Sequence, residues 1–134
     1  MRLIVLIALT TGMRASEVFG LRWPDVLHDE GLLAVRAKLK GGKMRYVPLL
    51  PEVASDLRHY PPETSDDRLF PPRKGANGNR RRLEGSFEDL LRRARISNSR
   101  FHDLRHTSAS WYMMNGGDLC ELAKILGHSN MKMT

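Results

Sequence analysis

The sequence predicts an α+β fold that is mainly helical and carries one small three-stranded antiparallel sheet. An apolar run covers residues 3–10, short apolar runs of strand type follow between residues 26 and 49, and helical spacing returns from residue 51 onward. A chain of 134 residues without repeats or low-complexity tracts is long enough to bury the core of one domain. We therefore expect a single domain over residues 1–134.

The first third of the chain predicts two helices and no membrane segment. The apolar run at 3–10 is too short to span a bilayer and no small-residue cleavage site follows it, so we expect the buried helix of a cytoplasmic protein. Gly12 ends this helix. A second, short helix is predicted over residues 16–21, and Pro24 prevents its extension.

The middle of the chain predicts the sheet. Short apolar runs occupy residues 26–27, 32–35 and 46–49. The segments between them, Asp-Glu-Gly at 29–31 and Lys-Gly-Gly-Lys at 40–43, have the composition of tight turns. Such turns join neighbouring strands, so we expect an antiparallel order along the chain.

Helical spacing dominates the second half. The segment 61–79 is rich in proline and predicts an exposed connection, anchored by Leu69 and Phe70. The single cysteine, Cys120, lies among leucines in a helical pattern, which predicts a buried thiol in a reducing compartment. Helices are predicted over residues 51–60, 80–95, 102–115 and 118–126.

Charge points to a polyanionic partner. The chain holds 22 Lys and Arg against 15 Asp and Glu, a net charge of +7, which favours nucleic acid over an anionic membrane surface. The helix at 80–95 is amphipathic. Its outward face carries arginines, either a solvated surface or a DNA contact, and its inward face is predicted to consist of Leu83, Phe87, Leu90 and Leu91.

Cationic side chains near the C-terminal end indicate an anion pocket. His102 and Arg105 are three residues apart and share a helix face, and Gly127 can end a helix and present His128. Arg14 and Lys40 are further candidates. Two arginines can hold one phosphodiester, a mobile lysine can protonate a leaving alkoxide, and histidines exchange protons near neutral pH. No cluster of carboxylates occurs, which disfavours a two-metal nuclease mechanism.

Four motifs in order resemble the catalytic domain of the tyrosine recombinase (phage integrase) family. They are Thr-Gly-Met-Arg-Ala-Ser-Glu at 11–17, Lys-Gly-Gly-Lys-Met-Arg-Tyr-Val-Pro at 40–48, His-Asp-Leu-Arg-His-Thr at 102–107 and Leu-Gly-His-Ser at 126–129. Each alone recurs by chance, but together they cover nearly the whole chain. The resemblance implies a recombinase catalytic-domain fold and DNA strand cleavage and rejoining.

The resemblance also implies roles for individual residues. Arg14 and Arg105 would grip the scissile phosphate, and Lys40 would be the general acid for the leaving 5′ oxygen. His102 would assist proton transfer from the nucleophile, and His128 would hydrogen-bond a non-bridging oxygen. The expected products are a 3′-phosphotyrosyl link and a free 5′ hydroxyl.

Supporting residues and partners follow from the same resemblance. Glu17, one turn after Arg14, would orient it by an ion pair. The partners implied are double-stranded DNA in the nucleoid and further recombinase protomers, four in the full-length family, with neither metal nor nucleotide cofactor. Expected contacts to the DNA backbone are Lys43, Arg45, Arg80, Arg81 and Arg82.

One family feature is not found. In the family the nucleophilic tyrosine follows Leu-Gly-His by roughly nine residues, and the sequence given ends at Thr134. None of Tyr46, Tyr60 and Tyr112 has that position. The expectation is an incomplete catalytic domain, without its tyrosine segment and without the family's N-terminal DNA-clamping domain, that binds DNA but does not cleave it.

Other interpretations stay open. The chain could be a catalytically silent DNA-binding module, either a remnant or an accessory protein. A zinc-dependent hydrolase could use His102, His106 and His128 as ligands, although His106 also suits a core histidine bonded to the backbone. Arg14 could merely form a surface pair with Glu17, worth under about 1 kcal/mol. Lys40 could be ordinary turn polarity.

Overall fold

The computed structural model describes residues 1–36, 44–60, 67–71 and 78–127, with no side-chain detail for residues 78–84. In these parts the chain is mainly helical and forms a three-stranded antiparallel sheet, so the predicted fold class is confirmed. No helix in the described segments is long and apolar enough to cross a membrane.

The sheet has the order β1-β2-β3, with β1 (Val26–Leu27) and β2 (Leu32–Val35) at the predicted residues. Strand β3 (Arg45–Pro48) begins one residue earlier than predicted, because Arg45 pairs with Val35 at the end of β2. Within β3 only Val47 is buried, while Tyr46 and Pro48 are exposed. The alternation places Arg45 on the same face as Val47, toward the interior.

The N-terminal helix α1 (Arg2–Thr11) ends at Gly12, as predicted. Helix α2 (Ala15–Val18) is shorter than predicted, and a single 3₁₀ turn, η1 (Trp23–Asp25), follows it. The reason is long-range pairing. The N–H of Leu69 donates to the carbonyl of Leu21, and the N–H of Trp23 donates to the carbonyl of Asp67, so residues 21–23 form an extended pair with residues 67–69 instead of a helical turn.

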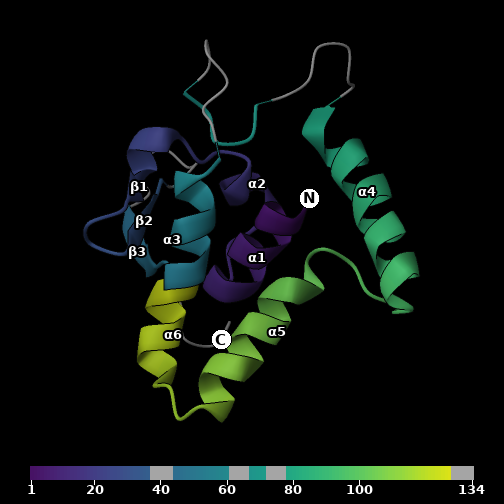
Figure 1. Cartoon of the computed structure of the whole chain (residues 1–134). Coiled ribbons are helices and arrows are strands. Elements are labelled where there is room, and N and C mark those ends of the chain that lie inside the picture. Colours follow the sequence, from purple (N-terminus) through teal and green to yellow (C-terminus); the bar gives the residue numbers. More distant parts are fainter. Residues whose placement is uncertain (37–43, 61–66, 72–77, 128–134) are drawn as a thin grey trace.

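The remaining four helices lie around α1 and the sheet (Figure 1). Helices α3 and α5 both pack against α1, and α6 packs against β3, while α4 runs along the outside of the molecule. All four lie within a few residues of their predicted bounds. They are α3 (Pro51–Arg58), α4 (Gly78–Ala94), α5 (Asp103–Met114) and α6 (Leu119–Leu126).

One continuous core joins the helices and the sheet. Leu69 and Phe70 are buried in it, which confirms them as the anchor of the connection before α4. Helix α4 attaches through Phe87, whose ring meets Phe101 edge-on with centroids 5.4 Å apart. The largest fully buried side chains include Ile7, Val18, Leu33, Val47 and Leu57.

Some burial predictions were wrong. Cys120 is exposed, because α6 turns Leu122, Ala123 and Leu126 toward the core and Cys120 lies on the opposite side of the helix. Leu90 is 36% exposed at the edge of the apolar face of α4, whose interior contact is made by Phe87 and half-buried Leu91. Leu83, the fourth residue predicted to face inward on this helix, lies outside the described side chains.

Candidate functional site

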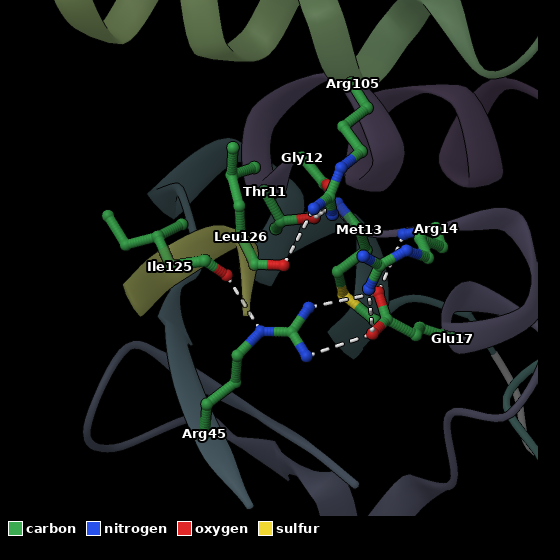
Figure 2. A network of polar contacts seen from close by, with 9 residues as sticks. All are labelled: Thr11, Gly12, Met13, Arg14, Glu17, Arg45, Arg105, Ile125 and Leu126. Atoms are coloured by element: carbon green, nitrogen blue, oxygen red, sulfur yellow. Dashed lines mark hydrogen bonds and ion pairs between the residues drawn. The ribbon is translucent and has the colours of Figure 1, made fainter. Parts of the chain in front are cut away.

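Three arginines from separate parts of the sequence converge where α1, α2, β3, α5 and α6 meet (Figure 2). Arg14 directly precedes α2, Arg45 begins β3, and Arg105 projects from the first turns of α5. Glu17 of α2 lies between Arg14 and Arg45. The structure thus brings together three of the four motifs and the start of the fourth.

Arg105 is buried, with 5% of its surface exposed. Its Nη1 donates to the carbonyl of Gly12 at 2.7 Å and its Nη2 donates to the carbonyl of Leu126 at 2.8 Å. These carbonyls lie at the C-terminal ends of α1 and α6, where the helix dipole is negative and favours a cation. Arg105 therefore ties the ends of two helices to α5.

Two glycines make this close approach possible. Gly12 has φ +64° and Gly127 has φ +69°, the left-handed conformation that ends a helix. A Cβ on Gly12 would lie 2.6 Å from Cδ2 of Leu126, and a Cβ on Gly127 would lie 3.0 Å from Nη1 of Arg45. Both positions therefore need glycine for conformation and for space.

Glu17 is the carboxylate that organises the arginines. Its Oε2 accepts the backbone N–H of Arg14 at 2.8 Å, and its Oε1 lies 3.5 Å from Nη1 of Arg14, so the expected pair is present. Arg45 forms a bidentate pair with the same carboxylate, both bonds being 3.0 Å long. Arg45 also donates from Nε to the carbonyl of Ile125 at 2.8 Å.

The electrostatics of the cluster favour an anionic ligand. Burial alone would raise the pKa of Glu17, but hydrogen bonds from Arg45 and from the Arg14 backbone outweigh it, and the pKa is lowered. Burial, together with the charge of Arg14, lowers the pKa of Arg105 from 12.5 to about 10, so it stays protonated at neutral pH. The cluster contains three guanidinium groups and one carboxylate. A bound anion would offset the remaining positive charge.

Two of the predicted histidines lie at the N-terminal end of α5. His102 and His106 are exposed, and their rings meet edge-on with centroids 5.1 Å apart. His106 is therefore not a core histidine. Within the described residues no group of three His, Cys, Asp or Glu side chains could hold a metal ion. His128, the third ligand of the zinc alternative, lies outside the described residues, and so that set of three ligands stays untested.

Other predicted residues also lie outside the described part of the chain. Lys40 and Lys43 belong to the segment 37–43, and the side chains of Arg80, Arg81 and Arg82 are not described. The side chain of Arg45, which was predicted to contact DNA, is 15% exposed, and its Nε, Nη1 and Nη2 donate within the protein. This internal role was not predicted from the sequence. The alternation of the strand, with Arg45 two residues before buried Val47, was the available signal.

The fold is a mainly helical domain in which three arginines from separate motifs lie together. The model of the phage integrase family matches residues 1–134, and the chain belongs to this family, as a tyrosine recombinase catalytic domain.

A related sequence is tyrosine recombinase XerC of Xanthomonas axonopodis pv. citri, 33% identical over 129 residues, which cover 93% of this chain and 42% of XerC. The crystal structure of XerA recombinase superposes with a TM-score of 0.84 at 31% identity, over 97% of this chain and 50% of XerA. XerH site-specific recombinase, bound to its difH substrate, gives a TM-score of 0.81 at 26% identity, over 98% of this chain and 40% of XerH. The chain thus spans less than half the length of the curated relatives it matches.

Proposed function

We propose that this domain binds double-stranded DNA and grips one phosphodiester between Arg14 and Arg105, as the phosphate-holding part of a site-specific recombinase. The observation that carries the proposal is the convergence of three arginines at the ends of α1 and α6, where Arg14 and Arg45 pair with Glu17 and Arg105 donates to two backbone carbonyls. The net charge of +7 favours the same polyanionic partner. The DNA-bound XerH structure is a related protein in the expected bound state.

The chemistry proposed is strand transfer through a phosphotyrosine. A tyrosine oxygen attacks the phosphorus, the bond to the 5′ oxygen breaks, and Lys40 gives that oxygen a proton while His102 assists removal of the proton from the tyrosine. Arg14, Arg105 and His128 donate hydrogen bonds to the non-bridging oxygens, whose negative charge grows in the pentacoordinate transition state. A 5′ hydroxyl of a second strand then reverses the step. Neither metal nor nucleotide cofactor takes part.

We also propose that none of the tyrosines present is the nucleophile. Tyr46 is exposed on the face of β3 opposite Arg45. The ring of Tyr60 lies against Trp23, with centroids 6.3 Å apart, and against Phe70, with centroids 6.2 Å apart. Tyr112 donates its hydroxyl to Glu121, which raises its pKa and makes the attacking phenolate harder to form. The 134 residues alone would therefore bind DNA without cutting it.

A suicide-substrate assay tests both parts of the proposal. Nicked duplexes that trap a covalent intermediate are incubated with the 134-residue chain and with any longer product of the same gene that carries a tyrosine after Gly127. We expect DNA binding by both and a detergent-resistant protein–DNA band from the longer product alone. That band should disappear on Arg14→Ala. DNA binding by both without a band would favour the catalytically silent module instead.

A band from the 134-residue chain that disappears in Tyr46→Phe, Tyr60→Phe or Tyr112→Phe would overturn the assignment of the nucleophile. Because binding is measured separately from cleavage, loss of DNA binding and loss of chemistry are distinguished. Absence of DNA binding by either product would overturn the proposal as a whole.

A further inference from the structure

Arg45 is the side chain that connects the separate parts of the arginine cluster. It reaches from the first residue of β3 to Glu17 of α2 and to the carbonyl of Ile125 in the last turn of α6 (Figure 2). Its side chain is 15% exposed and that of Glu17 is 9% exposed. A bidentate guanidinium–carboxylate pair at this burial is directional, so it fixes the relative position of the groups it joins.

The two groups that Arg45 binds, the Glu17 carboxylate and the last turn of α6, each contact a different arginine of the proposed phosphate grip. Through Glu17 the connection leads to Arg14, whose backbone N–H and guanidinium both approach the same carboxylate. Through the last turn of α6 it leads to Arg105, which donates to the carbonyl of Leu126, one residue after the carbonyl that Arg45 binds. Arg45 thus contacts the supports of both arginines.

A third contact of Arg45 also indicates that it supports the site. The guanidinium of Arg45 lies against Gly127, so closely that an added Cβ would be 3.0–3.2 Å from three of its atoms. Gly127 ends α6 and directly precedes His128 in the sequence. With Nε, Nη1 and Nη2 each donating inside the protein, the geometry of Arg45 suits support of the site rather than a contact with bound DNA.

From this geometry, and resting on the proposed function, we infer that Arg45 is a positioning residue: it holds Glu17 and the C-terminal turn of α6 in place so that Arg14 and Arg105 face one phosphate. Lysine cannot replace it. A lysine at this position keeps the positive charge but lacks the planar fork that binds Glu17 and the Ile125 carbonyl together.

The experiment uses inorganic phosphate as the probe and protein labelled with ¹⁵N in its arginines. The Nε–H signals of Arg14, Arg45 and Arg105 are assigned by substitution and followed during a phosphate titration of the wild type, of Arg45→Lys and of Glu17→Asp. Glu17→Asp retracts the carboxylate from Arg45 while keeping its charge. Arg36→Lys is the matched control, because Arg36 pairs with Asp25 outside the cluster.

In the wild type we expect phosphate to shift the Arg14 and Arg105 signals in a saturable way and to leave the Arg45 signal in place. Arg45→Lys and Glu17→Asp should each weaken phosphate binding by about tenfold, the effect of losing roughly one charge-assisted hydrogen bond. Arg36→Lys should bind phosphate as the wild type does. A dispersed Arg105 signal shows that each variant is folded.

Two results would overturn the role of Arg45. One is an Arg45 signal that moves with phosphate as strongly as those of Arg14 and Arg105, which would make it a direct ligand. The other is wild-type phosphate affinity in both folded variants. If the wild type itself shows no saturable shift of Arg14 and Arg105, the phosphate grip fails, which is a different outcome from failure of the positioning role alone.

Discussion

Gly12 connects the first motif to the last, and replacing it tests the geometry of the site most directly. Gly12→Ala places a side chain at φ +64°, which costs about 1–2 kcal/mol for a non-glycine residue. Its Cβ would also lie 2.6 Å from Cδ2 of Leu126, a side chain that is only 3% exposed and has little room to move. Overpacking of this kind adds about 1–3 kcal/mol. We expect Gly12→Ala to lower the free energy of unfolding by about 2–5 kcal/mol.

Two other glycines supply controls for the separate contributions. Gly116 has φ +81° and nothing within 4 Å of an added Cβ, so Gly116→Ala should cost only the conformational part, about 1–2 kcal/mol. Gly85 lies inside α4 with open space around it, so Gly85→Ala should stabilise the protein by about 0.5–1 kcal/mol. Urea unfolding followed by circular dichroism measures all three. A decrease for Gly12→Ala no greater than that for Gly116→Ala would refute the close packing of Gly12 on Leu126.

Arg105, Glu17 and Cys120 each supply a further prediction. Arg105→Ala should weaken binding to a nicked duplex and reduce the steepness of log K against log salt concentration by about 0.9, because one phosphate is no longer neutralised. Arg2→Ala, at an exposed pair with Asp56, is the control and should leave this slope unchanged. Equal slopes in the wild type and both variants would contradict the phosphate grip. The pKa of Glu17 is lowered from 4.5 in the folded state, so this group contributes stability that is present above pH 4.5 and is lost as the pH falls below it. Glu17→Gln should therefore flatten the acid side of the stability profile measured by urea unfolding, and an unchanged profile would show that the pair with Arg45 is not formed in solution. Cys120 is exposed, so a maleimide should label it in the native protein without denaturant, and protection from labelling would mean that α6 faces the other way.

Much of the fold could be predicted because its signals are local. The glycine at position 12 ends α1, the turn sequence at 29–31 joins β1 to β2, and helical spacing sets the bounds of α5 and α6 within a few residues. Each of these depends on neighbours a few residues away in the chain. The end of α2 could not be predicted in this way, since it depends on pairing between residues 21–23 and 67–69.

In the candidate site, too, the local features could be predicted and the long-range contacts could not. The sequence by itself determined the residue types, the order of the motifs and the positive charge, and these sufficed to indicate a tyrosine recombinase catalytic domain. Only the tertiary structure decided which guanidinium groups share a carboxylate. It turned Arg45 inward toward Glu17 and the end of α6, and it left His102 exposed. The position of Arg45 depends on a contact between residues 80 positions apart, its bond to the carbonyl of Ile125, and no local pattern encodes such a contact.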